Sequence, residues 1–145
     1  MEIYSIGFTK KTAEQFFGLL KKTGIRRLID VRLNNRSQLA GFSKQEDLRY
    51  FLREICGAEY LHEPLLAPTQ EILTGYRRKQ ISWDEYEKLF LSLMVGRQIQ
   101  DKLDRSLFSV PTVLLCSEPK PEHCHRRLVL AYLRDKWGGL EVRHL

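Results

Sequence analysis

The residue types best able to do chemistry gather in one segment near the end of the chain. Residues 116–127 read C-S-E-P-K-P-E-H-C-H-R-R, which brings thiols, imidazoles and guanidinium groups together. Pro121 suits the first position of a helix, where its missing N–H is not needed, and the N-terminus of a helix attracts anions. We therefore expect the thiol of Cys124, beside Arg126 and Arg127, to have a lowered pKa and to act as a nucleophile.

The same atoms allow other uses, which the sequence leaves open. Cys116, at the tip of an apolar strand, is either a second nucleophile or an inert buried thiol. Both cysteines, together with His123 or His125, could bind zinc, and water or Glu118 would complete the ligand set. Because no C-x-x-C pair is present, we predict no cofactor and keep zinc as an alternative. A disulfide between the two cysteines is a further use.

A second candidate group is the run L-I-D-V-R at residues 28–32. A carboxylate inside an apolar strand is costly unless it is paired or hydrogen-bonded. Asp30 therefore either organises the site, by pairing with Arg32 or Arg127, or acts as a general acid or base with a pKa set by burial. Arg32 and Arg36 are candidates to bind an anion, and a solvated surface position is the alternative for each.

Apolar runs and helical patterns alternate along the chain. Strands are predicted at residues 3–8, 28–31, 58–62, 111–116 and 140–144. Helices are predicted at residues 12–24, 43–57, 82 to about 103 and 121–137, and capping boxes begin three of them at Thr12, Ser43 and Ser82. This order predicts a single α/β domain over residues 1–145, a three-layer sandwich with a mostly parallel sheet of about five strands and helices on both faces. Residues 63–81 fit neither pattern and are predicted to be a lid or binding loop.

In open α/β sheets, ligands bind at the carboxyl ends of the strands. Polar residues follow each predicted strand at that end, including Tyr60 and His62 near the end of the third strand. The predicted catalytic residues at this edge are Asp30, Cys116, Glu118, Cys124 and His125. The predicted anion-binding residues are Gly7, Arg32, Arg36, Arg126 and Arg127.

Composition restricts the class of protein. The chain has 145 residues, 43% of them hydrophobic, and a formal net charge of +6, which excludes a disordered chain and favours anionic partners. The sequence contains no stretch of the about 18 apolar residues that a membrane span needs, and its start lacks the features of a signal peptide. Three cysteines do not suggest a disulfide framework, so we expect a cytoplasmic protein. The sequence indicates no oligomeric state.

The runs I-Y-S-I-G-F, L-I-D-V-R and V-L-L-C-S-E-P-K-P-E-H-C-H-R-R resemble the domain of unknown function 488 family over essentially the whole chain. Phe8 stands where the family often has a histidine, and Leu33-Asn34-Asn35 replaces its proline. The resemblance supplies positions and no reaction. The signature positions that it implies are Asp30, Arg32, Cys116, Glu118, Cys124, His125 and Arg126.

These residues favour an enzyme that acts on a phosphate-bearing substrate, either a nucleotide or nucleic acid. It is not a phosphatase of the C-x5-R type, because the first arginine after Cys116 is Arg126. The alternatives are a non-catalytic module that binds nucleotide or nucleic acid, and a zinc-supported site. Two carboxylates beside the arginines favour catalysis, since pure anion binding needs neither.

Overall fold

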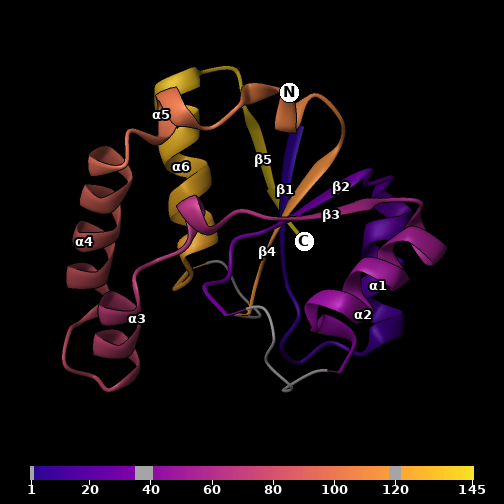
Figure 1. The fold of residues 1–145 in the computed structure, drawn as a ribbon, viewed down its shortest axis with the longest axis horizontal. Coiled ribbons are helices and arrows are strands. Elements are labelled where there is room, and N and C mark those ends of the chain that lie inside the picture. The colour runs from indigo at the N-terminus through magenta and orange to yellow at the C-terminus, as the bar shows by residue number, and fades with distance from the viewer. Residues whose placement is uncertain (1, 35–40, 118–121) are drawn as a thin grey trace.

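One sheet of five parallel strands forms the centre of the protein (Figure 1). The structure is a computed structural model and describes residues 2–34, 41–117 and 122–145. In chain order the strands are β1 (Glu2–Gly7), β2 (Arg27–Asp30), β3 (Glu59–His62), β4 (Thr112–Cys116) and β5 (Glu141–His144). Their spatial order is β3-β2-β4-β1-β5, which confirms the predicted sheet of about five strands.

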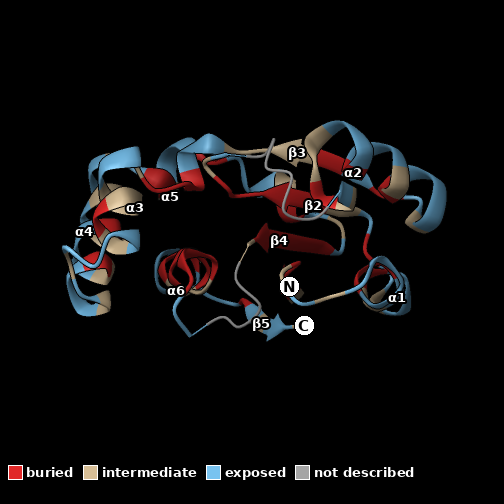
Figure 2. Cartoon of the chain, turned by 90° about the horizontal axis from the view of Figure 1, so that it is seen from below, coloured by how far each residue is buried: buried red, intermediate tan, exposed pale blue. Residues whose placement is uncertain are grey.

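Helices cover both faces of this sheet, which confirms the three-layer sandwich (Figure 2). The helices are α1 (Ala13–Thr23), α2 (Gln45–Phe51), α3 (Gln70–Arg77), α4 (Trp83–Gly96), α5 (Ile99–Lys102) and α6 (His125–Trp137). Helices α1 and α2 lie on one face, and α4 and α6 lie on the other. Among the described residues, no helix is both long and apolar enough to cross a membrane.

The alternation of side chains along the inner strands divides the core between the two faces. Val113 and Leu115 of β4 pack toward α1 and α2, whereas Leu114 and Cys116 pack toward α4 and α6. Because a strand presents successive side chains to opposite faces, Asp30 and Val31 at the end of β2 also belong to opposite faces. The two candidate groups therefore lie on different sides of one sheet.

Two of the three predicted capping boxes are present. Thr12 caps α1 and Ser82 caps α4, each with the reciprocal bond from the third helical residue. The box at Ser43 was wrong: Lys44 is the N-cap of α2, and it makes no side-chain cap. Ser43 instead lies buried in a short 3-10 turn (Gly41–Ser43), where its carbonyl accepts a hydrogen bond from Arg32. The helix starts after this turn, so Ser43 does not occupy its N-cap position.

The prediction that residues 63–81 are irregular was wrong, because the segment contains a 3-10 turn (Pro64–Leu66) and α3. Thr69 caps α3, and the helix packs against α4. The guanidinium of Arg97 donates to the carbonyls of Leu65 and Ala67, 2.7 Å to each.

The last helix also differs from its prediction, since α6 begins at His125 and Pro121 lies outside the described residues.

Candidate functional site

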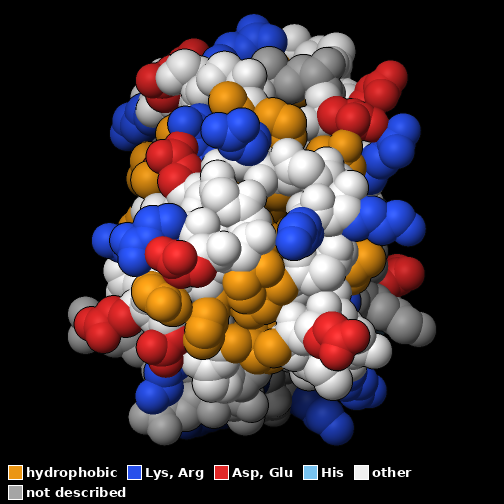
Figure 3. Space-filling view, turned by 90° about the vertical axis from the view of Figure 1, so that its right-hand side faces the viewer, with side chains coloured by type: hydrophobic (Ala, Val, Ile, Leu, Met, Phe, Trp, Pro, Cys, Tyr) orange, Lys and Arg blue, Asp and Glu red, His pale blue; other side chains and the backbone are white. Residues whose placement is uncertain are grey.

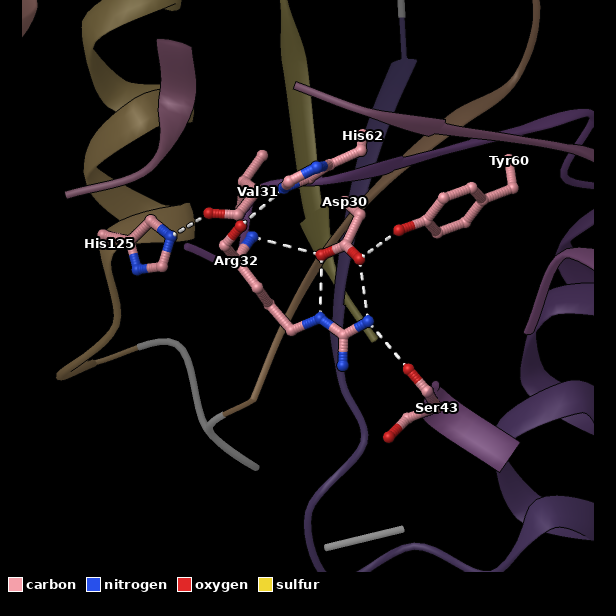
Figure 4. A network of polar contacts seen from close by, with 7 residues as sticks. All are labelled: Asp30, Val31, Arg32, Ser43, Tyr60, His62 and His125. Atoms are coloured by element: carbon pink, nitrogen blue, oxygen red, sulfur yellow. Dashed lines mark hydrogen bonds and ion pairs between the residues drawn. The ribbon is translucent and has the colours of Figure 1, made fainter. Parts of the chain in front are cut away.

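The carboxylate of Asp30 lies at the end of β2 and is fully buried. Its Oδ1 accepts hydrogen bonds from the backbone N–H and the Nε of Arg32, at 3.1 and 2.8 Å. Its Oδ2 accepts from Nη2 of Arg32 at 2.7 Å and from the hydroxyl of Tyr60 at 2.6 Å (Figure 4). A carboxylate has about four acceptor positions, and all are taken here. Of the two predicted roles, this geometry favours the organising one.

Arg32 is held from several directions. Besides its two bonds to Asp30, its Nη2 donates to the Ser43 carbonyl at 2.8 Å, and its own carbonyl accepts from Nε2 of His62 at 2.8 Å. The ring of Phe8 lies beneath the guanidinium, 5.3 Å from centroid to Cζ. Burial lowers the pKa of Arg32, but the hydrogen bonds and charge of Asp30 outweigh burial, so the pKa lies above its ordinary value. The group is a fixed, permanent cation.

One nitrogen of this cation has no hydrogen-bond partner in the described part of the chain. Nη1 of Arg32 is buried, and it makes no hydrogen bond with any residue that the structure describes. In Figure 4 it points away from Asp30 and from the sheet. An unpaired buried N–H of a charged group is costly, so this donor is a candidate to bind an external acceptor.

The second group lies on the α6 face. Cys116 ends β4, Cys124 is the N-cap of α6, and His125 is its first residue. The three side chains are buried, and one ligand atom from each lies within 4.8 Å of the other two. Nδ1 of His125 is 3.5 Å from the sulfur of Cys116, and Nε2 is 2.7 Å from the carbonyl of Val31. Since a carbonyl only accepts, Nε2 carries the proton, and a neutral ring has its lone pair on Nδ1.

The predicted low pKa of Cys124 was wrong. Burial raises the pKa of this thiol well above its ordinary value, and the neighbouring Cys116 raises it further. His125 acts in the opposite direction and does not compensate. The side chain is only 2% exposed, because α4 and the sheet cover the start of α6. The sequence places a cysteine near a helix N-terminus, but only packing decides whether water reaches its sulfur.

Residues 12–133 match the sequence model of a family described as Domain of unknown function DUF488. The chain belongs to this family. No curated protein and no solved structure matches the chain. The DUF488 match includes Asp30, Arg32 and residues 116–127, so both groups of the site lie within the matched region.

In this DUF488 protein, backbone groups at the ends of β2 and β4 connect the two faces. The amide of Val31 donates to the carbonyl of Leu115 at 3.1 Å. The carbonyl of Val31 accepts from His125 on one face, while the next carbonyl, that of Arg32, accepts from His62. Arg32 and the thiol–imidazole group, which consists of Cys116, Cys124 and His125, are therefore anchored to consecutive residues after β2.

Other cations lie near the same edge, by the end of β1. Arg126 is fully buried, and its Nε donates to the hydroxyl of Ser5 at 3.1 Å. Gly7, paired in register with Cys116, accepts a hydrogen bond from Nζ of Lys11 at 2.8 Å. Burial lowers the pKa of Lys11, and the charge of Arg126 lowers it further, so these two cations repel each other.

The structure separates other predicted residues from this site. Arg127 is 35% exposed and pairs with Glu87 of α4 at 3.5 Å. His123, predicted as a possible zinc ligand, stacks instead on Trp83, with ring centroids 5.1 Å apart. His125 takes its place beside the cysteines. Arg36 and Glu118 lie outside the described residues.

Three residues that contribute to the site are missing from the predicted set. His62 ends β3, so the sheet-edge rule that selected Asp30 also points to it, whereas Tyr60 lies two residues earlier in the same strand. Lys11 follows β1 by four positions, and nothing in its local sequence distinguishes it from the other lysines of the chain. Only the hydrogen bond to Gly7 identifies it.

An apolar hollow of about 640 Å³ lies apart from this site, between α1 and α2. Its lining includes Phe17, Phe42, Phe51 and Ile55, and none of the predicted site residues contributes to it. Figure 3 shows apolar side chains gathered on one face of the molecule, with charged groups around them.

Proposed function

We propose that this protein is an enzyme that acts on a phosphate-bearing substrate, either a nucleotide or nucleic acid, at the carboxyl edge of the sheet. Nη1 of Arg32 carries the proposal. It is a buried donor on a permanent cation, without a partner among the described residues and directed away from the sheet. Phosphate oxygens, like carboxylate oxygens, are acceptors that a guanidinium binds strongly and often in a bidentate way.

The rigidity of Arg32 supports a binding role. A charged group that serves only solubility is flexible and exposed, whereas this guanidinium is 3% exposed and fixed by Asp30 and the Ser43 carbonyl. Such fixing removes the conformational entropy cost of ordering the side chain when a ligand binds. Lys11 and Arg126 increase the positive potential at the same edge, and an anion would relieve their repulsion.

The thiol–imidazole group supports catalysis rather than binding alone. Anion binding requires no thiol, and a buried histidine whose Nε2 is fixed by a backbone carbonyl has a defined tautomer. A side chain oriented in this way can accept or donate a proton at one known atom, Nδ1. We assign the reaction to the cluster formed by Cys116, Cys124 and His125, and the binding of the phosphate group to Arg32.

The test uses the variant Arg32→Lys. It keeps a buried positive charge beside Asp30 but removes Nη1, the guanidinium nitrogen that points away from the sheet. Binding of nucleotides, oligonucleotides and phosphorylated metabolites is measured by calorimetry and compared with Arg127→Lys. We expect the first variant to weaken phosphate binding at least about tenfold, because a hydrogen bond to a charged group contributes about 1.5–3 kcal/mol. The second variant should bind like the natural chain. Equal binding by the two variants would exclude Arg32 as the phosphate-binding residue.

Catalysis is tested separately on the compounds that bind. We expect Cys116→Ser and His125→Gln to retain phosphate binding within about threefold and to lose turnover, because neither side chain holds the anion. If the natural chain binds such compounds and converts none of them, the protein is a non-catalytic binding module and the proposal of an enzyme is wrong.

A further inference from the structure

We propose that Cys116, Cys124 and His125 form a binding site for one thiophilic divalent metal ion, of the kind typified by Zn²⁺. The inference does not depend on the proposed phosphate substrate. It rests on three ligand atoms of the soft and borderline types that such ions prefer, all within 4.8 Å of one another and all buried.

The spacing fits tetrahedral coordination. With Zn–S bonds of about 2.3 Å and Zn–N bonds of about 2.0–2.1 Å, a sulfur and a nitrogen on one tetrahedral ion lie about 3.5 Å apart. The sulfur of Cys116 and Nδ1 of His125 are separated by 3.5 Å. The two ligands already lie at the required distance, and Cys124 lies within reach of both.

The orientation of His125 provides a second, independent argument. A histidine that binds a metal through one nitrogen almost always donates its other N–H to a carboxylate or a backbone carbonyl, which fixes the ring. Nε2 of His125 donates to the carbonyl of Val31 at 2.7 Å (Figure 4). A neutral ring therefore keeps its lone pair on Nδ1, the nitrogen nearer to the sulfur of Cys116, at 3.5 Å against 4.0 Å for Nε2. The outer contact of a metal ligand is thus present.

The third argument is the presence of two thiols. A nucleophilic cysteine needs one sulfur and one base, and Cys116 with His125 would suffice. A divalent ion accounts for the second sulfur. When it binds, each thiol releases one proton to solvent, and two thiolates with a neutral imidazole balance the charge of the ion. Buried thiolates without a counterion would be costly.

Among the described residues, three ligands are present, and they leave one position of a tetrahedral ion open, as in catalytic rather than structural zinc sites. In the metal-bound form of the proposed enzyme, Nδ1 of His125 binds the ion and no longer transfers a proton, and the open position would take water or a substrate oxygen. This one consequence rests on the proposed function.

The test is cobalt and zinc binding to the reduced, chelator-treated protein. We expect one Co²⁺ per chain with thiolate-to-cobalt charge-transfer absorption, and displacement of Co²⁺ by Zn²⁺. Cys116→Ser, Cys124→Ser and His125→Gln should each weaken binding at least about 100-fold, because loss of even an outer contact costs 10- to 100-fold. The matched controls, Cys56→Ser and His123→Gln, should change it less than about threefold. Binding without charge transfer, or equal losses in ligand and control variants, would overturn the site.

A measurement on the natural chain guards against variants that do not fold. Zn²⁺ should protect Cys116 and Cys124 from alkylation and leave the rate at Cys56 unchanged. Equal alkylation of the two site cysteines with and without Zn²⁺ would also overturn the proposal. Arg32→Lys should bind metal normally, so failure of phosphate binding and failure of metal binding can be told apart.

Discussion

At the scale of single residues, the site depends on how charge is held inside the fold. The carboxylate of Asp30 and the guanidinium of Arg32 are both buried, and two side-chain hydrogen bonds join them. Such a pair contributes little net stability when both partners are present, but loss of one partner leaves an uncompensated buried charge. The pair therefore fixes the position of Arg32 more than it stabilises the protein.

Asp30→Asn is predicted to lower the free energy of unfolding by about 3–5 kcal/mol, because it removes the counterion of a buried cation. The control is Glu87→Gln, which breaks the half-exposed pair with Arg127 and should cost less than about 1 kcal/mol. Urea denaturation of both variants measures the difference. Similar losses in the two variants would contradict the assignment of Asp30 as the group that neutralises Arg32.

The raised pKa of Cys124 gives a second prediction at this scale. In metal-free protein the rate of alkylation at Cys124 should keep rising with pH above about 8.5, the pKa of a free thiol. The sign follows from burial, which favours the neutral thiol, so the thiolate forms only at higher pH. Mass spectrometry resolves the three cysteines. A rate at Cys124 that reaches its plateau below pH 8.5 would restore the expectation of an activated nucleophile.

At the scale of elements, the helices begin where side chains satisfy free backbone groups. The hydroxyl of Ser82 accepts from the amide of Glu85, and the Glu85 carboxylate accepts from the amide of Ser82. Helix ends carry a local signal too. At the C-terminal end of α1, Gly24 adopts a left-handed conformation (φ 74°), which residues with a side chain rarely adopt. Such local signals act within a few residues, so they place helix ends without knowledge of the rest of the fold.

Ser82→Ala is predicted to lower the free energy of unfolding by about 1 kcal/mol, since it removes the cap of α4. Ser92→Ala makes the same chemical change on the exposed side of the same helix and should be neutral or slightly stabilising, because alanine favours helices. Thermal unfolding of the two variants compares them directly. A loss at Ser92 as large as that at Ser82 would show that capping is not the cause.

At the scale of the whole molecule, the strand order determines which parts are protected. The residues of β4 are all buried, and this strand pairs with both β1 and β2. In contrast, β5 lies at an edge and most of its residues are exposed. The site is thus anchored to the most enclosed part of the sheet, which keeps Arg32 and Cys116 in fixed relative positions.

Hydrogen exchange should reflect this arrangement. The amides of β4, and that of Val31, which donates to Leu115, are expected to exchange only through global unfolding. The amides of β5 should exchange at least about tenfold faster, through local opening at the edge. Exchange measured residue by residue checks this order. Equal protection of β5 and β4 would mean that the edge strand is covered in solution.

The sequence by itself determined the alternation of strands and helices, the caps at Thr12 and Ser82, and the edge of the sheet where polar residues collect. These features depend on neighbours in the chain, through side-chain periodicity and hydrogen bonds that span a few residues. Family membership also follows from the sequence, because the residue pattern at Asp30, Arg32 and residues 116–127 is itself the signal.

Only the tertiary structure decided the chemistry within the site. His123 and His125 are equivalent in the sequence, but Trp83 of α4 stacks on the first, while the second donates to the Val31 carbonyl and lies 3.5 Å from the sulfur of Cys116. The pKa of Cys124 likewise depends on how completely distant segments exclude water from it. Contacts between residues far apart in the chain set both outcomes, and no local pattern records them.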